Sequence, residues 1–276
     1  MKTLYISDLD GTLLNKSAEL SRYTTDTLND LIRQGMHFSY ATARTAASTD
    51  VILSSVNLSL PVVLMNGVLV YDRKSRSYIK RETLGRNNVE KILDILKSTK
   101  MTGFMYEVKD DLLTVYHEKL ISRALQDFHD ERVKKYNKTF SPVGDLRNTV
   151  NEDIIYFCLL DTKERLDPVQ QQLKQIEGIK MACYKDIYSD NLWYIEVFSG
   201  NATKYNAAMF IKEYCGFSKM VGFGDNLNDL PLFHACDEAY AVANAAEEVK
   251  KASSQVIGSN MDDGVANWLK SHALLS

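Results

Sequence analysis

The sequence predicts an α/β fold in which a doubly wound parallel sheet is interrupted by an inserted α+β domain. At both ends of the chain, short apolar runs alternate with amphipathic helical segments, which is typical of a parallel sheet with helices on its faces. Between these ends, a helix followed by two strands occurs twice, which indicates a separate antiparallel sheet. We therefore expect a core made of residues 1–83 and 191–276, and an inserted domain at 84–190.

The first part of the core is expected to alternate between strands and helices. Its strands are expected at 3–7, 36–41 and 62–65, and its helices at 20–34, closed by Gly35, and at 46–56. Asn66-Gly67 is a strong two-residue turn signal, so residues 68–71 are expected to return as the partner strand of a hairpin.

The rest of the chain is assigned in the same way. In its middle part we expect helices at 89–96, 120–133 and 163–175, and strands at 102–107, 112–117, 154–160, 179–184 and 192–198. Residues 134–151 are polar and irregular and are expected to form a loop. After residue 199 we expect helices at 203–214, 230–236, 245–252 and 265–269, and strands at 219–223, 239–242 and 255–257.

Composition excludes several classes of protein. The 276 residues carry a net charge of −3, which argues against a nucleic-acid partner or a membrane-surface partner, because both usually need a basic excess. No apolar run is long enough to span a bilayer, and the N-terminus does not resemble a signal peptide, so we expect a cytoplasmic location. The four cysteines form no CxxC pair and are expected to be reduced thiols: Cys158, Cys183, Cys215 and Cys236.

The stretch Asp8-Leu9-Asp10-Gly11-Thr12-Leu13 is the most informative part of the chain. It follows the first strand, so both carboxylates are expected at the sheet edge where ligands bind in open α/β folds. An aspartate there can bind a hard cation such as Mg²⁺ through oxygen, and it can also attack a phosphorus atom. An ordinary turn would explain Asp-Gly alone, but the longer string directly after a strand is much more specific.

Three further groups fall at strand ends or helix starts of the same expected sheet. Thr42, with Arg44 close behind, follows the second strand; Lys204 lies in the first turn of a helix; and the stretch 224–229, Gly-Asp-Asn-Leu-Asn-Asp, follows a strand. Each alone could be a helix cap, a solvated lysine or a turn. Together they offer the nucleophile, proton donor, metal ligands and cation that phosphoryl transfer requires.

On these motifs the chain resembles the haloacid dehalogenase superfamily of phosphohydrolases, whose first motif is Asp-x-Asp-Gly-Thr/Val. The insert resembles the cap of the Cof-type sugar-phosphatase branch. Two short motifs also resemble motifs of that branch: Asn66-Gly67 and Asp263-Gly264-Val265-Ala266. The resemblance implies a Rossmann-like core with a mobile α/β cap. It also implies a Mg²⁺-dependent phosphatase that acts on small phosphorylated metabolites.

The resemblance implies a division of labour between the two acids of the first motif. Asp8 would be the nucleophile that forms an aspartyl-phosphate. Asp10 would protonate the leaving alcohol and then activate water, and its backbone carbonyl would face the metal. Asp8 must be ionised to attack, and Mg²⁺ with Lys204 would favour that form.

The resemblance also implies the remaining roles. The magnesium site would involve Asp8, Asp10, Asp225 and Asp229. Thr42, Lys204 and Asn228 would contact the phosphoryl group. Lys204 would also stabilise the negative charge of Asp8. Arg44 is a candidate for the far end of the substrate, although a core salt bridge is as plausible. Ala43 stands where the family usually has glycine in Thr-Gly-Arg, and one methyl group should be tolerated if the backbone is not left-handed.

The insert would select the leaving group, and the loop at 185–191 is the better candidate for substrate contact. The candidate residues there are Tyr184, Asp186 and Tyr188. The sequence does not indicate which metabolite is cleaved or the oligomeric state. Two alternatives stay open: a phosphomutase or phosphotransferase of the same superfamily, and a non-catalytic metabolite-binding protein on this scaffold.

Overall fold

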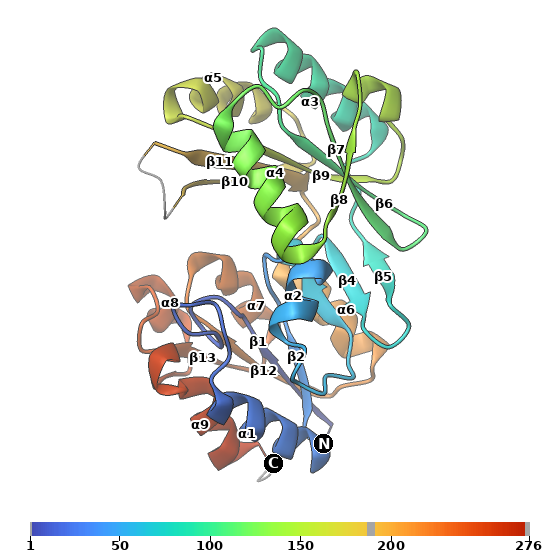
Figure 1. Ribbon diagram of the computed structural model, residues 1–276. Coiled ribbons are helices and arrows are strands. Elements are labelled where there is room, and N and C mark those ends of the chain that lie inside the picture. The colour runs from blue at the N-terminus through green and yellow to red at the C-terminus, as the bar shows by residue number, and fades with distance from the viewer. Residues whose placement is uncertain (1, 187–190, 274–276) are drawn as a thin grey trace. The chain divides into compact units, whose positions relative to one another are not determined.

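The computed structural model describes residues 2–186 and 191–273, and the chain forms two compact units (Figure 1). The first unit, here called the core unit, combines Met1–Lys80 with Thr203–Ser276, and the second, here called the inserted unit, is Arg81–Ala202. No helix among the described residues is long and apolar enough to cross a membrane.

The core unit is built on a five-stranded parallel sheet with the strand order β14-β13-β12-β1-β2. Its strands are β1 (Thr3–Ser7), β2 (His37–Tyr40), β12 (Lys219–Gly224), β13 (Glu238–Val242) and β14 (Gln255–Ile257). All five residues of β1 are buried, as a central strand covered on both faces requires. The predicted α/β class with a parallel, doubly wound sheet is confirmed.

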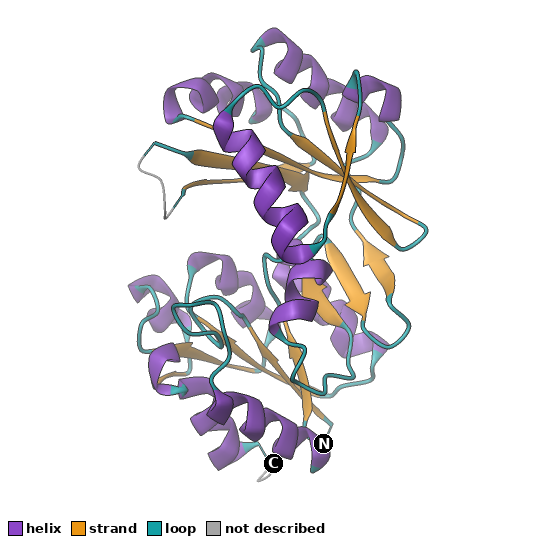
Figure 2. Cartoon of the chain, viewed as in Figure 1, coloured by secondary structure: helices purple, strands orange, loops and turns teal. Residues whose placement is uncertain are grey.

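Helices cover both faces of this sheet, and Figure 2 shows them as separate layers. They are α1 (Arg22–Arg33), α2 (Ala46–Ile52), α6 (Lys204–Tyr214), α7 (Leu230–Ala235), α8 (Glu247–Ala252) and α9 (Gly264–His272). Leu4 and Ile6 of β1 share an apolar cluster with residues of α6 and α7, whereas the ring of Tyr5 meets Trp268 of α9. Since neighbouring strand residues point to opposite faces, these helices lie on opposite sides of the sheet.

Two helix ends show why the local sequence forms these elements. Ser21 caps α1 by accepting a hydrogen bond from the backbone N–H of Thr24 at 2.9 Å. Gly35 follows the last turn with φ at 101°, the left-handed conformation that commonly ends a helix. Helix α2 ends at Ile52, earlier than the predicted residue 56.

The predicted third strand of the parallel sheet is only loosely joined to it. Strand β3 (Val62–Leu64) touches the parallel layer through a single bridge between Ala41 and Val63, and it belongs instead to a three-stranded sheet with β4 (Leu69–Asp72) and β5 (Ser77–Arg81). The hairpin of β3 with β4 is confirmed. Its turn is a 3₁₀ turn, Met65–Gly67, which is longer than the predicted two-residue turn.

The inserted unit contains a six-stranded sheet with the strand order β10-β11-β9-β6-β7-β8. Its strands are β6 (Phe104–Lys109), β7 (Leu112–His117), β8 (Thr139–Pro142), β9 (Ile154–Asp161), β10 (Ile179–Lys185) and β11 (Trp193–Ser199). The predicted antiparallel pairing holds everywhere except at the edge, where β7 and β8 are parallel.

Three helices pack on the two faces of this second sheet (Figure 1): α3 (Arg86–Ser98), α4 (Arg123–Tyr136) and α5 (Lys163–Leu173). Helices α3 and α5 share an apolar cluster with Met105 and Phe157 of the sheet. Helix α4 lies on the other face, where Phe128 stacks on Phe104 with ring centroids 4.7 Å apart. One face of the sheet is therefore covered by two helices and the other by one.

Two sequence-based assignments in this unit are wrong. The stretch 134–151 was expected to be a loop, but it contains the end of α4, strand β8 and the 3₁₀ turn Leu146–Thr149. Strand β8 was missed because it is a polar edge strand with no fully buried residue. The core was expected to resume at 191, yet β11 lies between β9 and β10 and belongs to the inserted unit.

Candidate active site

The two central strands of the core unit bring the first and last sequence motifs together. Ser7 of β1 lies in register with Phe223 of β12, so Asp8 and Asp225 follow neighbouring strands at the same sheet edge. The backbone N–H of Asp8 donates to the carbonyl of Phe223 at 2.9 Å, which extends the pairing to the acid itself. Residues more than 200 positions apart in sequence thus meet because parallel strands end at one edge.

Lys204, the first residue of α6, lies between two of the aspartates. Its Nζ donates to Oδ1 of Asp8 and to Oδ1 of Asp229, each at 2.6 Å. The lysine is 1% exposed, Asp8 5% and Asp229 0%, so this is a buried charge cluster. A lysine at a helix start is mildly unfavourable because of the helix dipole, and the two carboxylates compensate for it.

The buried cluster shifts the proton affinities of its members. Burial, reinforced by the neighbouring Asp229, raises the pKa of Asp8 well above its usual range, and Lys204 only partly offsets this. Burial tends to lower the pKa of Lys204, but the charges of Asp229 and Asp8 outweigh it, so the pKa of the lysine is raised. The ammonium group therefore stays charged at neutral pH.

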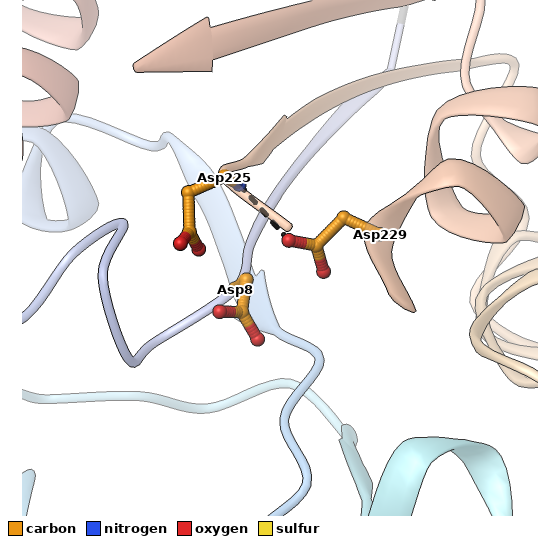
Figure 3. A group of neighbouring side chains, drawn as sticks. All are labelled: Asp8, Asp225 and Asp229. Atoms are coloured by element: carbon orange, nitrogen blue, oxygen red, sulfur yellow. Dashed lines mark hydrogen bonds between the residues drawn. The ribbon is translucent and has the colours of Figure 1, made fainter. Parts of the chain in front are cut away.

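Asp229 and Asp225 are held by a tight loop after β12. Oδ2 of Asp229 accepts hydrogen bonds from the backbone N–H groups of Asp225 and Asn226 at 2.9 and 3.1 Å. The side chain of Asn226 completes a capping box with Asp229 at the turn Leu227–Asp229. Figure 3 shows the side chains of Asp8, Asp225 and Asp229 grouped together, with the hydrogen bond from the Asp225 N–H to Asp229 dashed.

Asp225 is oriented from the first motif. Oγ1 of Thr12 donates to Oδ1 of Asp225 at 2.7 Å, and Thr12 is almost fully buried. Gly11 makes room for this contact, since a Cβ at its position would lie 2.4 Å from Oδ2 of Asp225. Burial raises the pKa of Asp225 to about 6, against the lowering effect of the Thr12 hydrogen bond.

The carboxylates fit a hard divalent cation. One oxygen from each of Asp8, Asp225 and Asp229 can lie within 4.8 Å of the others. Among the described residues, Oδ2 of Asp8 and Oδ2 of Asp225 accept no hydrogen bond, whereas both oxygens of Asp229 are engaged. An all-oxygen donor set with excess negative charge suits Mg²⁺, with Asp8 and Asp225 as the available direct ligands and Asp229 in support.

The carboxylate of Asp10 lies outside this group. It is about half exposed and forms a two-point ion pair with Arg44, whose Nε and one terminal nitrogen lie 2.7 and 2.6 Å from its oxygens. Thr42 is fully buried, and its Oγ1 accepts a hydrogen bond from the backbone N–H of Arg44 at 3.2 Å. The backbone at Ala43 has no positive φ, so the methyl group that replaces the family glycine meets no strain there.

Two contacts at this edge were not anticipated from the sequence. Nδ2 of Asn228 donates to Oδ1 of Asn66 at 3.3 Å, and Nδ2 of Asn244 donates to the carbonyl of Gly11 at 2.7 Å. In the sequence, Asn66 is explained by the turn and by the short Asn66-Gly67 motif of the Cof-type branch, and neither predicts its partner. Neither partner could be found from spacing, because each lies more than 160 positions away in sequence.

The candidates in the inserted unit lie on and after strand β10. Oη of Tyr184 donates to Oε1 of Glu196 at 2.9 Å, and the side chain of Asp186 is hydrogen-bonded to Tyr194. Tyr184 is 43% exposed, so it also presents surface to a ligand. Tyr188 lies outside the described residues.

Comparison with known proteins now places the chain in a family. Residues 5–269 match the model of the haloacid dehalogenase-like hydrolases. The chain belongs to this family. The resemblance inferred from the sequence is confirmed. The protein is a hydrolase, and the phosphatases among its relatives indicate that it is a phosphatase.

Relatives match over nearly the whole chain. The 5-amino-6-(5-phospho-D-ribitylamino)uracil phosphatase YitU of Bacillus subtilis is 26% identical over 273 residues, which cover 96% of this chain and 95% of that protein. The pyridoxal phosphate phosphatase YbhA of Escherichia coli is 23% identical, with 97% of each chain covered. The crystal structure of TM0651 from Thermotoga maritima superposes with a TM-score of 0.80 at 27% identity and covers 98% of this chain and 97% of its own.

Proposed function

We propose that the protein is a Mg²⁺-dependent phosphatase that hydrolyses small phosphomonoesters through an aspartyl-phosphate on Asp8. One observation carries the proposal: one oxygen of the Asp8 carboxylate is held by the buried ammonium of Lys204, while the other accepts no hydrogen bond from a described residue. A carboxylate fixed on one side and available on the other suits nucleophilic attack.

In the first step, the Asp8 carboxylate attacks the phosphorus atom and the bond from phosphorus to the leaving alkoxide breaks. Asp10 gives its proton to that oxygen, so the leaving group departs as an alcohol. For this the ion pair between Asp10 and Arg44 must open, and an anionic substrate would compete for the same guanidinium group. Arg44 is therefore proposed to bind an anionic part of the substrate.

In the second step, water attacks the phosphorus atom of the aspartyl-phosphate while Asp10 takes up its proton. The bond between phosphorus and the Asp8 oxygen breaks. Inorganic phosphate is released and the free carboxylate is regenerated. Mg²⁺, when bound to Asp8 and Asp225, would supply positive charge that keeps Asp8 ionised despite its burial. Lys204 holds Asp8 in place, and Thr42 and Asn228 are proposed to donate hydrogen bonds to the phosphoryl oxygens.

The proposed substrate class is a small phosphorylated metabolite. Relatives named for a phosphoribitylamino-uracil and for pyridoxal phosphate support this class but leave the individual compound open. The inserted unit is proposed to act as a cap that selects the leaving group, with Tyr184 and Asp186 as contact candidates.

Phosphate release from a panel of sugar phosphates, nucleotides, pyridoxal phosphate and p-nitrophenyl phosphate tests the proposal. We expect release with Mg²⁺, none with EDTA, and recovery when Mg²⁺ is restored. Asp8→Asn should lower kcat by about 10⁴-fold or more, because an amide cannot act as the nucleophile.

Asp30→Asn on the exposed face of α1 is the matched control and should keep wild-type activity, since Asp30 only pairs with Arg33 at the surface. A folded Asp8→Asn protein with near-wild-type release would exclude Asp8 as the nucleophile. If the phosphoryl group is transferred to a second sugar in a metal-dependent reaction and no phosphate is released, the protein would be a phosphotransferase and not a phosphatase.

A further inference from the structure

Three consecutive residues after strand β3 have left-handed backbone. Met65, Asn66 and Gly67 have φ values of 50°, 56° and 99°. Asparagine and glycine tolerate this conformation, but for methionine it is uncommon and costs free energy. Such a segment persists only where its surroundings fix it, and here the surroundings are the proposed phosphate-binding loops.

The backbone of this segment is bonded to the loop that carries Thr42 and Arg44. The N–H of Met65 donates to the carbonyl of Arg44 at 3.1 Å, and the N–H of Asn66 donates to the carbonyl of Thr42 at 2.9 Å. Thr42 is fully buried, and these bonds hold the backbone from which its side chain extends. The left-handed turn thus sets the position of one proposed phosphate contact.

The same segment contacts the start of helix α6. A Cβ at Gly67 would lie 2.2 Å from the carbonyl oxygen of Thr203, so only glycine permits this approach. Thr203 is the N-cap of α6, and the next residue is Lys204. The loop that leads into α6 and Lys204 therefore packs against the turn Met65–Gly67.

The side chain of Asn66 reaches a third loop. Its Oδ1 accepts the hydrogen bond from Nδ2 of Asn228, and among the described residues its own amide nitrogen donates to none. The charge of Lys204 is already shared between two carboxylates. A phosphoryl dianion therefore needs neutral N–H and O–H donors in addition to Lys204, and the amide of Asn228 and the hydroxyl of Thr42 are the proposed donors.

We propose that Asn66 is a positioning residue for phosphoryl binding, which orients the amide of Asn228 while its left-handed backbone fixes Thr42. The inference deepens the proposed function and rests on it. It assigns a chemical task to Asn66-Gly67, a turn signal in the sequence that the reaction itself does not use.

The test uses Asn66→Gly, which keeps the left-handed backbone and removes only the amide, together with Asn228→Ala and the double variant. For p-nitrophenyl phosphate we expect Asn66→Gly to lower kcat/KM about tenfold, mainly through KM. If Asn66 acts through Asn228, the double variant should be no worse than Asn228→Ala alone.

Asn137→Gly is the matched control, because Asn137 is also left-handed, with φ at 49°, but it ends helix α4 in the inserted unit. It should stay within about twofold of wild type, since surface changes away from a site have small effects. Unchanged kcat/KM in Asn66→Gly, or losses that add in the double variant, would overturn the proposal.

Binding of inorganic phosphate, measured by calorimetry, separates this proposal from the proposed function. If the wild type binds phosphate but hydrolyses no ester in the panel, the phosphatase assignment fails while the positioning role can still be decided. About tenfold weaker phosphate binding by Asn66→Gly, but not by Asn137→Gly, would then support it. Equal binding by all three proteins, or no binding by the wild type, would overturn it.

Discussion

Asp8 in the core unit is buried and Glu196 in the inserted unit is half-buried, and the two carboxylates have different hydrogen-bond partners. Asp8 of the core unit lies against the ammonium of Lys204, and burial raises its pKa despite that charge. Glu196 on β11 of the inserted unit accepts hydrogen bonds from the hydroxyls of Tyr184 and Tyr156, and burial raises its pKa as well. The first carboxylate is balanced by a cation, whereas the direct partners of the second are neutral.

The difference indicates what each unit can do. A cluster of three carboxylates and one lysine keeps an excess of negative charge, which attracts a divalent cation. The positive charge of that cation would in turn favour the ionised form of the nucleophile, which the neighbouring carboxylates disfavour. A carboxylate held by tyrosine hydroxyls tolerates a proton, since its partners lose no ion pair when it becomes neutral. The core unit is thus organised around charge, and this region of the inserted unit around neutral hydrogen bonds.

The largest effect on stability is expected from removing the cation of the core unit. Lys204→Met keeps the length of the side chain but leaves Asp8 and Asp229 buried without their partner. We expect unfolding free energy to fall by about 3–5 kcal/mol, as for other broken buried pairs, and kcat to fall by about 10²–10³-fold. Urea denaturation and phosphate release measure the two effects.

Lys212→Met provides the control on the same helix. Lys212 pairs with Asp237, whose side chain is nearly half exposed, so its loss should cost no more than about 1 kcal/mol and leave kcat unchanged. Equal destabilisation by the two variants would contradict the view that the core cluster depends on its buried cation.

Much of the core unit could be predicted because its signals are local. Fully buried strands such as β1 appear as apolar runs, and the motif residues Asp8, Lys204, Asp225 and Asp229 do come together at one edge. That convergence follows from the topology, since parallel strands end at the same edge. The chemical roles of these residues stay predictions.

What could not be predicted depends on tertiary contacts. Strand β8 has no apolar run, and the left-handed conformation of Met65 arises from bonds to a loop about 20 residues away. The ion pair that draws Asp10 toward Arg44, away from the other carboxylates, likewise has no signature in spacing. Local propensity describes elements well, but partners across a sheet edge require the folded chain.

A medium effect is expected from the contact that orients Asp225. Thr12→Val keeps the shape of the buried side chain and removes the hydroxyl that donates to Asp225. We expect the Mg²⁺ concentration for half-maximal activity to rise about 10–100-fold, with kcat at saturating metal less affected, because partners of metal ligands tune affinity. Thr12→Ser, which retains the hydroxyl, should restore most of the affinity, and an equal loss in both variants would assign Thr12 to packing alone.

The smallest expected effect tests the neutral partners of the inserted unit. Burial raises the pKa of Glu196 above its ordinary value of 4.5, against the lowering effects of the Tyr156 and Tyr184 hydrogen bonds and of the Arg132 and Lys138 charges. As pH rises from about 4.5 through the raised value, the unfolded chain loses this proton before the native state does, so this group destabilises the fold progressively.

The glutamine in Glu196→Gln cannot ionise, so this variant should not lose stability as pH rises through this range. Its Tm relative to wild type should therefore increase between about pH 4 and pH 8, by on the order of a few degrees. The Tm difference should be largest near pH 8. Glu152→Gln, at an exposed position of the same unit, should show no such trend. A variant whose Tm relative to wild type falls as pH rises would mean that nearby positive charge stabilises the Glu196 carboxylate more than burial destabilises it, and the contrast between the two units would be lost.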